Sequence, residues 1–586
     1  MHYTSPEVYE FISKQTNDPI VERKTCRVSG VKFAIFQSDL GFYKKISPRF
    51  GDKVFQISTP TLCPEERQRR RMMFLNERKL YRRKCSATGE IIISTYSPDK
   101  THTVYDKDYR RSDNREWADY AKEIDFSDTV FYQLEGLVKQ VPHASLLIED
   151  NENCPYVNNC WRNKNCYMCF SCDYAENCYY CQDTLSAKNA VDCYMCRDVE
   201  IAYDCTNCKN CFHIQHSQTS NNCKYSYFLT DCDSCSYCFS CSGLRNKSYC
   251  ILNKQYAKED YFDKIQKMAM SGTYSQNTFS KYIYGERNET AYGDNIFNAQ
   301  NMVFWFDVID MEDCKFCYNM KWCKNVYDTY RWWATLESSY ENTLVGAGCS
   351  DVFFSCFIIN NCSNIFYSSE CFSCKNCFAC SGLKNKQYCI LNKQYSKEEY
   401  EKLVPQIIEK MQADWERGEF FDSSLSSFGY NETVAQEYFP LMRDEALSRW
   451  YKRQDNNYDP KIPDGIEVIG WEDIPSDIAQ VTDDILKRIL VCEVSGRPYR
   501  IIKQELEFYR KHNLPLPRKH PDIRHEERLK QRPSRELHLR KCDKCGKEMV
   551  SVYQKDPLLG GEGLGWGQTQ EQKVYCEGCY QQEVYG

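Results

Sequence analysis

Between residues 153 and 394 the small and polar positions of the chain recur every three and every six residues. All cysteines of the range Cys154–Cys250 are separated by multiples of three, and ten of the eleven in Cys314–Cys389 keep such a register, with Cys349 out of step. A repeating backbone unit explains this register, because each coil of a solenoid presents equivalent positions to the same environment. Asn-Cys pairs in one six-residue phase occur at 153–154, 159–160, 165–166 and 177–178.

The period also indicates which kind of solenoid to expect. An α-solenoid needs longer units with a period of 3.6 residues, which this region lacks. Short repeats with small residues at fixed corners are typical of a parallel β-solenoid, in which Asn and Cys side chains stack as ladders from coil to coil. Coils of twelve, eighteen and twenty-four residues all fit multiples of six, so the length of one coil stays open.

The solenoid pattern occurs twice, and each copy leads into a helical pattern. FSCSGLRNKSYCILNKQYAKEDY begins at Phe239, and FACSGLKNKQYCILNKQYSKEEY begins at Phe378, 139 residues later. After the second copy, Ser396 and Glu399 form a capping box, and apolar residues fall on one helical face. We expect each helix to cap the open end of its solenoid. The residues of that face are Tyr400, Leu403 and Ile407.

The two ends of the chain carry related modules. CRVSGVKFAIFQSDLGFYKK starts at Cys26, and CEVSGRPYRIIKQELEFYRK starts at Cys492; the match resumes after a nine-residue difference in length. The predicted fold class is therefore mainly β, with two parallel β-solenoids with helical caps, flanked by two related zinc-ribbon-like α+β modules. The expected units are an N-terminal module at 20–112, a connector at 113–152, the first solenoid and its cap at 153–270, a linker at 271–295, the second solenoid and its cap at 296–414, an acidic connector at 415–490 and the C-terminal module at 491–586.

The strongest chemical signal is Cys542-Asp-Lys-Cys545 followed by Cys576-Glu-Gly-Cys579. Each C-x-x-C pair can form a knuckle that directs both thiolates at one ion, and two knuckles complete a tetrahedral zinc site with a structural role. Iron and a pair of disulfides are the alternatives. The N-terminal module lacks this set, because Cys85, Thr88, Asp106 and Tyr109 stand at the four positions.

A second, weaker metal site in each module would have two ligands. Cys26 would act with Cys63 in the first module and Cys492 with His520 in the second. A serine takes the place of a knuckle cysteine in both modules. Buried thiols in a module held by packing explain the same residues, and we favour that interpretation.

The repeat cysteines allow three interpretations, namely metal clusters, disulfides and packed free thiols. The spacing from Cys232 to Cys241 is similar to that of ferredoxins but lacks their longer third gap and proline. The second solenoid exchanges many of these positions for bulky residues, as at 303–306 and 331–333. Essential metal ligands would not be exchanged so freely, so we expect small buried side chains packed inside narrow coils. The bulky aromatic residues could instead form a stacking surface for sugars or bases.

Two arginine-rich stretches form a third candidate site. From Pro64 to Cys85 the chain has nine Lys or Arg and three acids, and the arginines favour one side of a predicted helix. Beside a zinc ribbon, such a helix would form a phosphate-binding surface for nucleic acid. Salt bridges to the acidic connector or the solenoid rim explain these arginines equally well. The residues are Arg67, Arg71, Arg78 and Arg82 in the first module and Arg524, Arg528 and Arg535 in the second.

Composition indicates in which compartment the protein works and whether its cysteines are reduced. No apolar run approaches the roughly 18 residues of a membrane span. The first residues lack the build of a secretory signal. We therefore expect a cytoplasmic protein without a membrane segment. In that setting 37 cysteines indicate reduced thiols and metal thiolates rather than a disulfide scaffold.

Charge and motifs narrow the function. The net charge of −6 gives the whole chain no general attraction to nucleic acid. Motifs for nucleotide binding, zinc proteases and serine hydrolases are missing. We predict a non-enzymatic zinc-binding scaffold that presents its solenoid faces to a protein or polymer partner. The alternatives are a nucleic-acid-binding protein that uses the modules and arginine-rich helices, and a solenoid enzyme that acts on a polysaccharide.

The layout resembles a family of uncharacterised cysteine-rich repeat proteins of environmental bacteria. The resemblance covers nearly the whole chain. It is carried by the paired CxxSG modules, the NCYxC repeats, the SGLxNKxYCILNKQY coil ends and the FGYNET segment. It implies the architecture described above and no particular activity.

Overall fold

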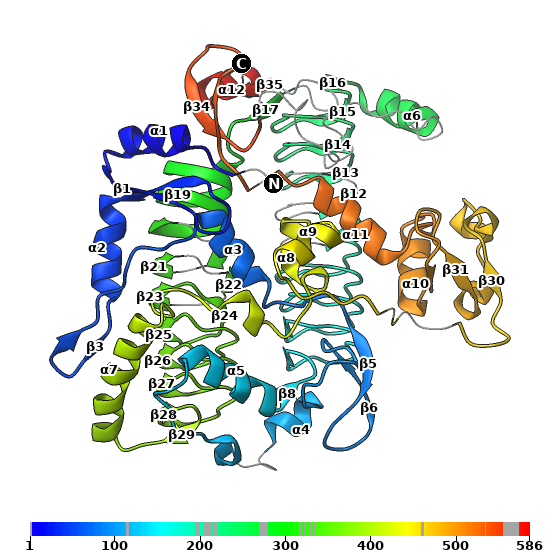
Figure 1. Ribbon diagram of the computed structural model, residues 1–586. Coiled ribbons are helices and arrows are strands. Elements are labelled where there is room, and N and C mark those ends of the chain that lie inside the picture. The colour runs from blue at the N-terminus through cyan, green and yellow to red at the C-terminus, as the bar shows by residue number, and fades with distance from the viewer. Residues whose placement is uncertain are drawn as a thin grey trace.

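The computed structural model is mainly β, with two stacks of short strands that lie side by side (Figure 1). Together they form a parallel β-solenoid of about fourteen turns over residues 148–390. The predicted fold class is confirmed. The structure describes residues 3–112, 117–193, 200–203, 212–215, 217, 220–268, 279–315, 318–321, 323–327, 330–332, 336–456, 458, 462–533, 535–554 and 573–585.

Parallel strands, most of them short, build both stacks; the last strand of each stack pairs antiparallel with the strand before it. The first contains β9 (Ile148–Glu149), β10 (Cys160–Trp161), β11 (Glu200–Tyr203), β12 (Phe212–Gln215), β13 (Lys224–Tyr227), β14 (Ser236–Phe239), β15 (Ser248–Ile251) and β16 (Lys254–Gln255). The second contains β18 (Gly285–Glu286), β19 (Glu289–Lys315), β20 (Tyr318–Lys321), β21 (Cys323–Tyr327), β22 (Tyr330–Trp332), β23 (Leu336–Tyr340), β24 (Thr343–Val345), β25 (Ser350–Phe353), β26 (Ser363–Phe366), β27 (Lys375–Phe378), β28 (Gln387–Ile390) and β29 (Lys393–Gln394).

One coil of the first solenoid has twelve residues, made of four triplets. Parallel bridges join Glu152 to Lys164 and Lys164 to Glu176, so each step along the stack is twelve residues. Every third residue from Asp150 to Asp192 has a left-handed backbone, with φ between 49° and 59°. Each triplet therefore consists of a bridging residue, a left-handed corner and an inward-pointing residue. This geometry explains the three-residue register of the cysteines.

The inward-pointing cysteines satisfy the backbone as well as fill the coil. The Cys166 Sγ lies 3.3 Å from the carbonyl oxygen of Lys164 in its own coil and 3.4 Å from that of Ala175 in the next. Ser226 takes the same place in another coil, where its hydroxyl accepts the N–H of Cys238 at 3.0 Å. The solenoid cysteines whose side chains the structure describes are free thiols, and all of them but Cys154 are buried. They therefore act as small hydrogen-bonding core residues.

A change of coil length explains why Cys349 is out of step. Cys323 pairs with Leu336, thirteen residues on, and the following coil keeps the same step. The N–H of Cys362 then donates to the Sγ of Cys349, again thirteen residues apart. Three successive extra residues return the chain to its original phase by Cys362. Cys349 thus occupies an ordinary inward position.

A helix follows the last coil of each solenoid and packs against its strands. α6 (Lys258–Met268) follows the first and α7 (Lys397–Ala413) the second. In α7, Ser396 and Glu399 form the predicted capping box, with bonds of 3.2 Å and 2.9 Å. Tyr400 and Ile407 are buried on the predicted apolar face.

The modules and connectors surround the two stacks. The N-terminal part contains α1 (Pro6–Thr16), β1 (Ile20–Thr25), β2 (Lys32–Phe36), α2 (Gln37–Ile46), β3 (Arg49–Phe50), β4 (Lys53–Val54), α3 (Pro64–Met72), β5 (Tyr81–Lys84), β6 (Ile91–Ser94), β7 (Val104–Tyr105), α4 (Lys107–Arg111), η1 (Trp117–Tyr120), α5 (Val130–Gln140) and β8 (His143–Ala144). The C-terminal part contains β17 (Phe279–Lys281) before the second solenoid, and then η2 (Ser423–Leu425), η3 (Tyr430–Glu432), α8 (Val434–Tyr438), α9 (Arg443–Ser448), β30 (Val468–Ile469), η4 (Trp471–Asp473), η5 (Ile478–Gln480), η6 (Asp483–Lys487), β31 (Ile489–Val491), β32 (Pro498–Tyr499), α10 (Lys503–Lys511), α11 (Pro521–Lys530), β33 (His538–Lys541), β34 (Glu548–Ser551), β35 (Lys573–Tyr575) and α12 (Glu577–Tyr585).

Candidate metal centre

Four cysteine thiols meet in the C-terminal module. Cys542 and Cys545 lie in the turn between β33 and β34, whereas Cys576 directly precedes α12 and Cys579 lies in its first turn. All four Sγ atoms lie within 4.8 Å of one another, and those of Cys545 and Cys576 are 3.7 Å apart. The predicted ligands therefore converge on one point that could hold a metal ion.

The two cysteine pairs reach that point in different ways. The first pair sits in a knuckle, where the N–H of Gly546 donates to the carbonyl of Cys542 at 2.9 Å. Gly546 has φ of 73°, which glycine adopts without a Cβ clash. The second pair lies at a helix start rather than in the second knuckle that the spacing predicted. Residues 555–572, which connect the two pairs, lie outside the described residues.

The local electrostatics favour a thiolate at Cys542. Burial opposes the charged form, but backbone N–H groups, among them that of Cys576 at 3.3 Å, outweigh it and lower the pKa of Cys542 to about 6. Burial and the neighbouring thiols raise the pKa of Cys579 to about 12. A metal ion would replace the protons of all four groups. The positive end of the α12 dipole further stabilises negative sulfur there.

The unit that carries these thiols contacts both solenoids. β35 pairs in parallel with β17, and the N–H of Tyr282 donates to the carbonyl of Tyr575 at 3.0 Å. On the other side Arg245, from the last coil of the first solenoid, donates to the hydroxyl of Tyr580 at 3.2 Å. The four-thiol unit therefore joins the end of the first solenoid to the start of the second, at the upper end of Figure 1.

The same knuckle occurs three more times. In each copy the glycine N–H donates to the carbonyl of the cysteine that begins the turn. The residue directly after that cysteine donates its own N–H to the carbonyl of the residue two positions before a helix N-cap. Sequence comparison detected two related modules, but each module contains two copies of this unit. The C-x-x-[S/T/C]-G pattern was the signal for it. The glycines are Gly30, Gly89 and Gly496, after Cys26, Cys85 and Cys492, and the N-cap residues are Cys63, Asp106 and His520.

In the first weaker site the thiols of Cys26 and Cys63 lie within hydrogen-bonding distance, whereas in the second the backbone N–H of His520 donates to the Cys492 thiol. A hydrogen bond from the Cys63 thiol lowers the pKa of Cys26 to about 4, although burial opposes it. The His520 ring nitrogen Nδ1 accepts the N–H of Asp522 at 3.0 Å and so caps α11. Within the described residues, the one group of three or more His, Cys, Asp or Glu ligands is the four-cysteine cluster.

The basic helix predicted from Pro64 to Cys85 is wrong in its extent. α3 ends at Met72, and Arg82 lies exposed on β5. Asn76, four residues after that end, lies in a non-helical segment, where its side chain donates to the carbonyls of residues 79 and 95 at 2.9 Å and 2.8 Å. The four arginines therefore do not share one helix face.

The other predicted phosphate ligands lie inside the protein. Arg67 is 1 % exposed, and its guanidinium donates to the carbonyl of Leu62 at 3.0 Å. The remaining five form ion pairs within the protein, four of them with solenoid carboxylates, as the alternative interpretation predicted, and Arg78 with a carboxylate of the C-terminal module. These pairs are Arg71 with Glu341 at 3.8 Å, Arg78 with Asp522 at 3.5 Å, Arg524 and Arg528 with Asp192 at 3.2 Å each, and Arg535 with Asp307 at 2.6 Å.

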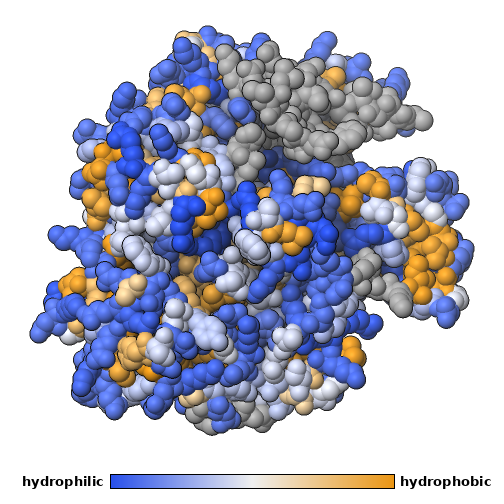
Figure 2. All heavy atoms as spheres, in the orientation of Figure 1, coloured by the Kyte–Doolittle hydropathy of each residue, from blue (hydrophilic) through white to orange (hydrophobic). Residues whose placement is uncertain are grey.

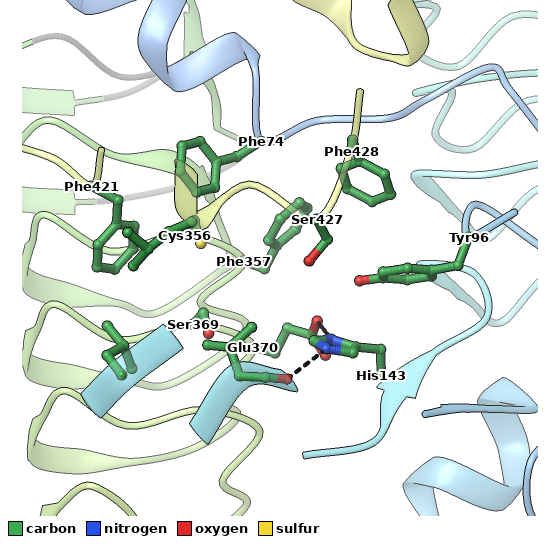
Figure 3. Close-up of a pocket in the computed structure, with 13 residues that line it drawn as sticks. Phe74, Tyr96, His143, Cys356, Phe357, Ser369, Glu370, Phe421, Ser427 and Phe428 are labelled. Atoms are coloured by element: carbon green, nitrogen blue, oxygen red, sulfur yellow. Dashed lines mark hydrogen bonds and ion pairs between the residues drawn. The ribbon is translucent and has the colours of Figure 1, made fainter. Parts of the chain in front are cut away.

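A small cavity of about 40 Å³ lies between the second solenoid, the N-terminal part and residues 421–428 of the connector (Figure 3). Its one carboxylate, Glu370, lies 2.6 Å from His143 Nδ1 and 2.8 Å from Arg110. The His143 ring stacks on Tyr96 with centroids 5.1 Å apart. This volume holds a water molecule rather than a sugar chain. Polysaccharide cleavage needs a pair of carboxyl groups, and Glu370 is the one carboxylate among the described residues that line this cavity.

No family model, curated protein or solved structure matches this chain. None of the helices in the described part of the chain is long and apolar enough to cross a membrane. In the view of Figure 2, hydrophilic residues dominate the surface and apolar residues form separate patches.

Proposed function

We propose that the protein is a non-enzymatic scaffold whose two solenoids are fastened together by a zinc-bound four-cysteine unit. The observation that carries this proposal is the position of that unit. It contacts Arg245 at the end of one solenoid and Tyr282 at the start of the other. A metal at this junction fixes the relative position of the two solenoids, and the long faces of the solenoids are the surfaces that bind a partner.

Zinc fits the four thiols better than other ions. Four thiolates in tetrahedral positions are a common structural zinc site, with no coordination position left for substrate. Soft thiolate ligands also exclude magnesium and calcium, which prefer oxygen. Iron has the same ligand preference and is distinguished by analysis of the metal.

A protein partner fits the surface better than nucleic acid or polysaccharide. Of the seven arginines predicted to bind phosphate, Arg82 is exposed, and the other six have side chains less than a tenth exposed. Buried guanidinium groups cannot release counterions from a phosphate backbone. If nucleic acid does bind, its affinity should fall steeply between low and physiological salt.

Metal content tests the proposal. The reduced, purified protein should contain about one zinc per chain, and thiol titration in denaturant with chelator should count close to 37 free thiols. Cys545→Ser should lose the zinc, because three thiolates and a hydroxyl bind it weakly. Cys154→Ser is the matched control, since Cys154 is a half-exposed solenoid cysteine outside the cluster. Several metals per chain, or zinc retained by Cys545→Ser, would contradict the proposal.

A further inference from the structure

The two solenoids end in coils of the same sequence and the same geometry. Leu252 and Asn253 have φ of 49° and 62°, and the equivalent Leu391 and Asn392 have 45° and 65°. Asn253 bonds the backbone of Ser242 at 2.8 Å and 2.7 Å, and Asn392 bonds that of the equivalent Ser381 at 2.9 Å and 2.8 Å. The two ends can therefore be compared residue by residue. They lie at opposite ends of the molecule, at β16 and β29 in Figure 1.

The end of the second solenoid is covered by a segment from the N-terminal part. The N–H of Lys122 donates to the carbonyl of Leu391 at 2.9 Å, and Lys122 forms a parallel bridge with Asn392. Glu123 pairs with Lys393 beside this bridge. Tyr120 and Ile124 pack against the large hydrophobic core. Under this cover Leu391 is 0 % exposed.

No described segment covers the end of the first solenoid in this way. Leu252 is 47 % exposed, and Asn253 and Lys254 are exposed too. Among the described residues no N–H donates to the carbonyl of Leu252, and no carboxylate lies within ion-pair distance of Lys254. Lys254 lies over the ring of Tyr256 at 5.6 Å, as Lys393 lies over Tyr395 at 5.2 Å. The same acceptor, apolar side chain and cation are present, but no strand in the described part of the chain engages them.

We propose that the open end of the first solenoid binds an extended peptide segment of a protein partner by strand addition. This inference rests on the proposed scaffold function and names its binding surface. The segment would donate a backbone N–H to the carbonyl of Leu252, place an apolar side chain over Leu252 and set a carboxylate beside Lys254. Main-chain bonds to a sheet end supply affinity, and the flanking side chains supply selectivity.

The covering segment itself provides the probe. An acetylated and amidated peptide of residues 117–124, Trp-Ala-Asp-Tyr-Ala-Lys-Glu-Ile, carries all three groups. With a fluorescent label it should bind the zinc-loaded full chain saturably, as measured by anisotropy. The intramolecular segment keeps the end of the second solenoid occupied, because its effective concentration is far higher. Binding should therefore report the first end.

Three changes test each contact separately. Leu252→Arg should weaken peptide binding by at least about tenfold, and Lys254→Glu should weaken it less. A peptide with an N-methyl group on the Lys122 amide should fail to bind, because it lacks the donor for the Leu252 carbonyl. Leu447→Arg is the matched control, since Leu447 is 44 % exposed at another place and should leave binding unchanged.

The outcomes separate this site from the scaffold itself. Absence of saturable binding, equal binding of the N-methyl peptide, or binding unaffected by Leu252→Arg would overturn the site. A concentration-dependent dimer that Leu252→Arg abolishes would mean that a second copy covers this end, and would overturn it too. Zinc is measured on the same samples. Failed peptide binding with one zinc per chain overturns the peptide site alone, whereas protein without zinc overturns the proposed zinc-bound four-cysteine unit.

Discussion

The guanidinium of Arg524 lies 3.2 Å from the carboxylate of Asp192, which occupies a left-handed corner of the first solenoid. Arg528, one helical turn later, reaches the same carboxylate at 3.2 Å. In the N-terminal module Arg70 reaches Glu341, at a left-handed corner of the second solenoid, at 2.7 Å. Each module thus holds one solenoid by buried arginines on an acidic corner.

Replacement of Asp192 should strongly destabilise the protein. Asp192 is 1 % exposed, so Asp192→Asn removes the carboxylate charge that two buried guanidinium groups share. Breaking a buried pair in this way costs roughly 3–5 kcal/mol. Urea unfolding would measure the loss.

A surface pair of the same solenoid provides the control for that measurement. Glu176 and Lys188 lie 3.6 Å apart with both side chains exposed, so Glu176→Gln should cost less than about 1 kcal/mol. Equal losses for Asp192→Asn and Glu176→Gln would show that the buried contact does not hold the module.

Substitutions of an inward cysteine should depend on size and hydrogen bonding. Cys238 is 0 % exposed, and Ser226 occupies the equivalent place one coil earlier. Cys238→Ser should therefore cost about 1 kcal/mol or less. Cys238→Leu should cost about 1–3 kcal/mol, because the added methyl groups overpack the narrow coil. Thermal unfolding would compare the two variants, and a tolerated leucine would argue against a close-packed interior.

Glu505 should make stability depend on pH. Burial raises its pKa to about 7, although Arg524 opposes this shift. Because the folded pKa lies above the ordinary value of 4.5, the native state binds the proton more tightly than the unfolded state. Its contribution is complete below about pH 4.5 and is lost as the pH rises through 7.

The variant Glu505→Gln isolates that contribution. Its amide does not titrate, so the stability of the variant relative to the natural protein should increase between pH 4.5 and 8, by up to about 3 kcal/mol. Unfolding in urea across this pH range measures the difference. A difference that stays constant with pH would contradict burial of the carboxylate.

Local spacing predicted the parts of the fold that repeat or close on themselves. The cysteine register is a direct consequence of the triplet coil, and the Cys542 and Cys545 pair belongs to one short turn. The coil length could not be predicted, because a six-residue period fits coils of twelve, eighteen and twenty-four residues equally well. The displaced phase of Cys349 needed the cross-coil pairing to explain it.

Contacts between distant segments account for what the sequence could not predict. The charge of Arg524 is matched by Asp192, more than 300 residues earlier, so its burial has no local signal. The segment that covers Leu391 contains Lys122, which precedes the whole first solenoid in the sequence. The nearly identical sequence at Leu252 therefore gave no indication that one end is covered and the other exposed.

Hydrogen–deuterium exchange at the amide of Tyr282 tests most directly whether metal in the four-cysteine unit fastens the two solenoids together. This amide donates to the carbonyl of Tyr575 beside the four cysteines, at 3.0 Å. We predict at least tenfold faster exchange there after zinc is removed by a chelator, with the amide of Cys377, inside the second solenoid, unchanged. Equal exchange at Tyr282 with and without metal would contradict the claim that the four-cysteine unit fastens the two solenoids together.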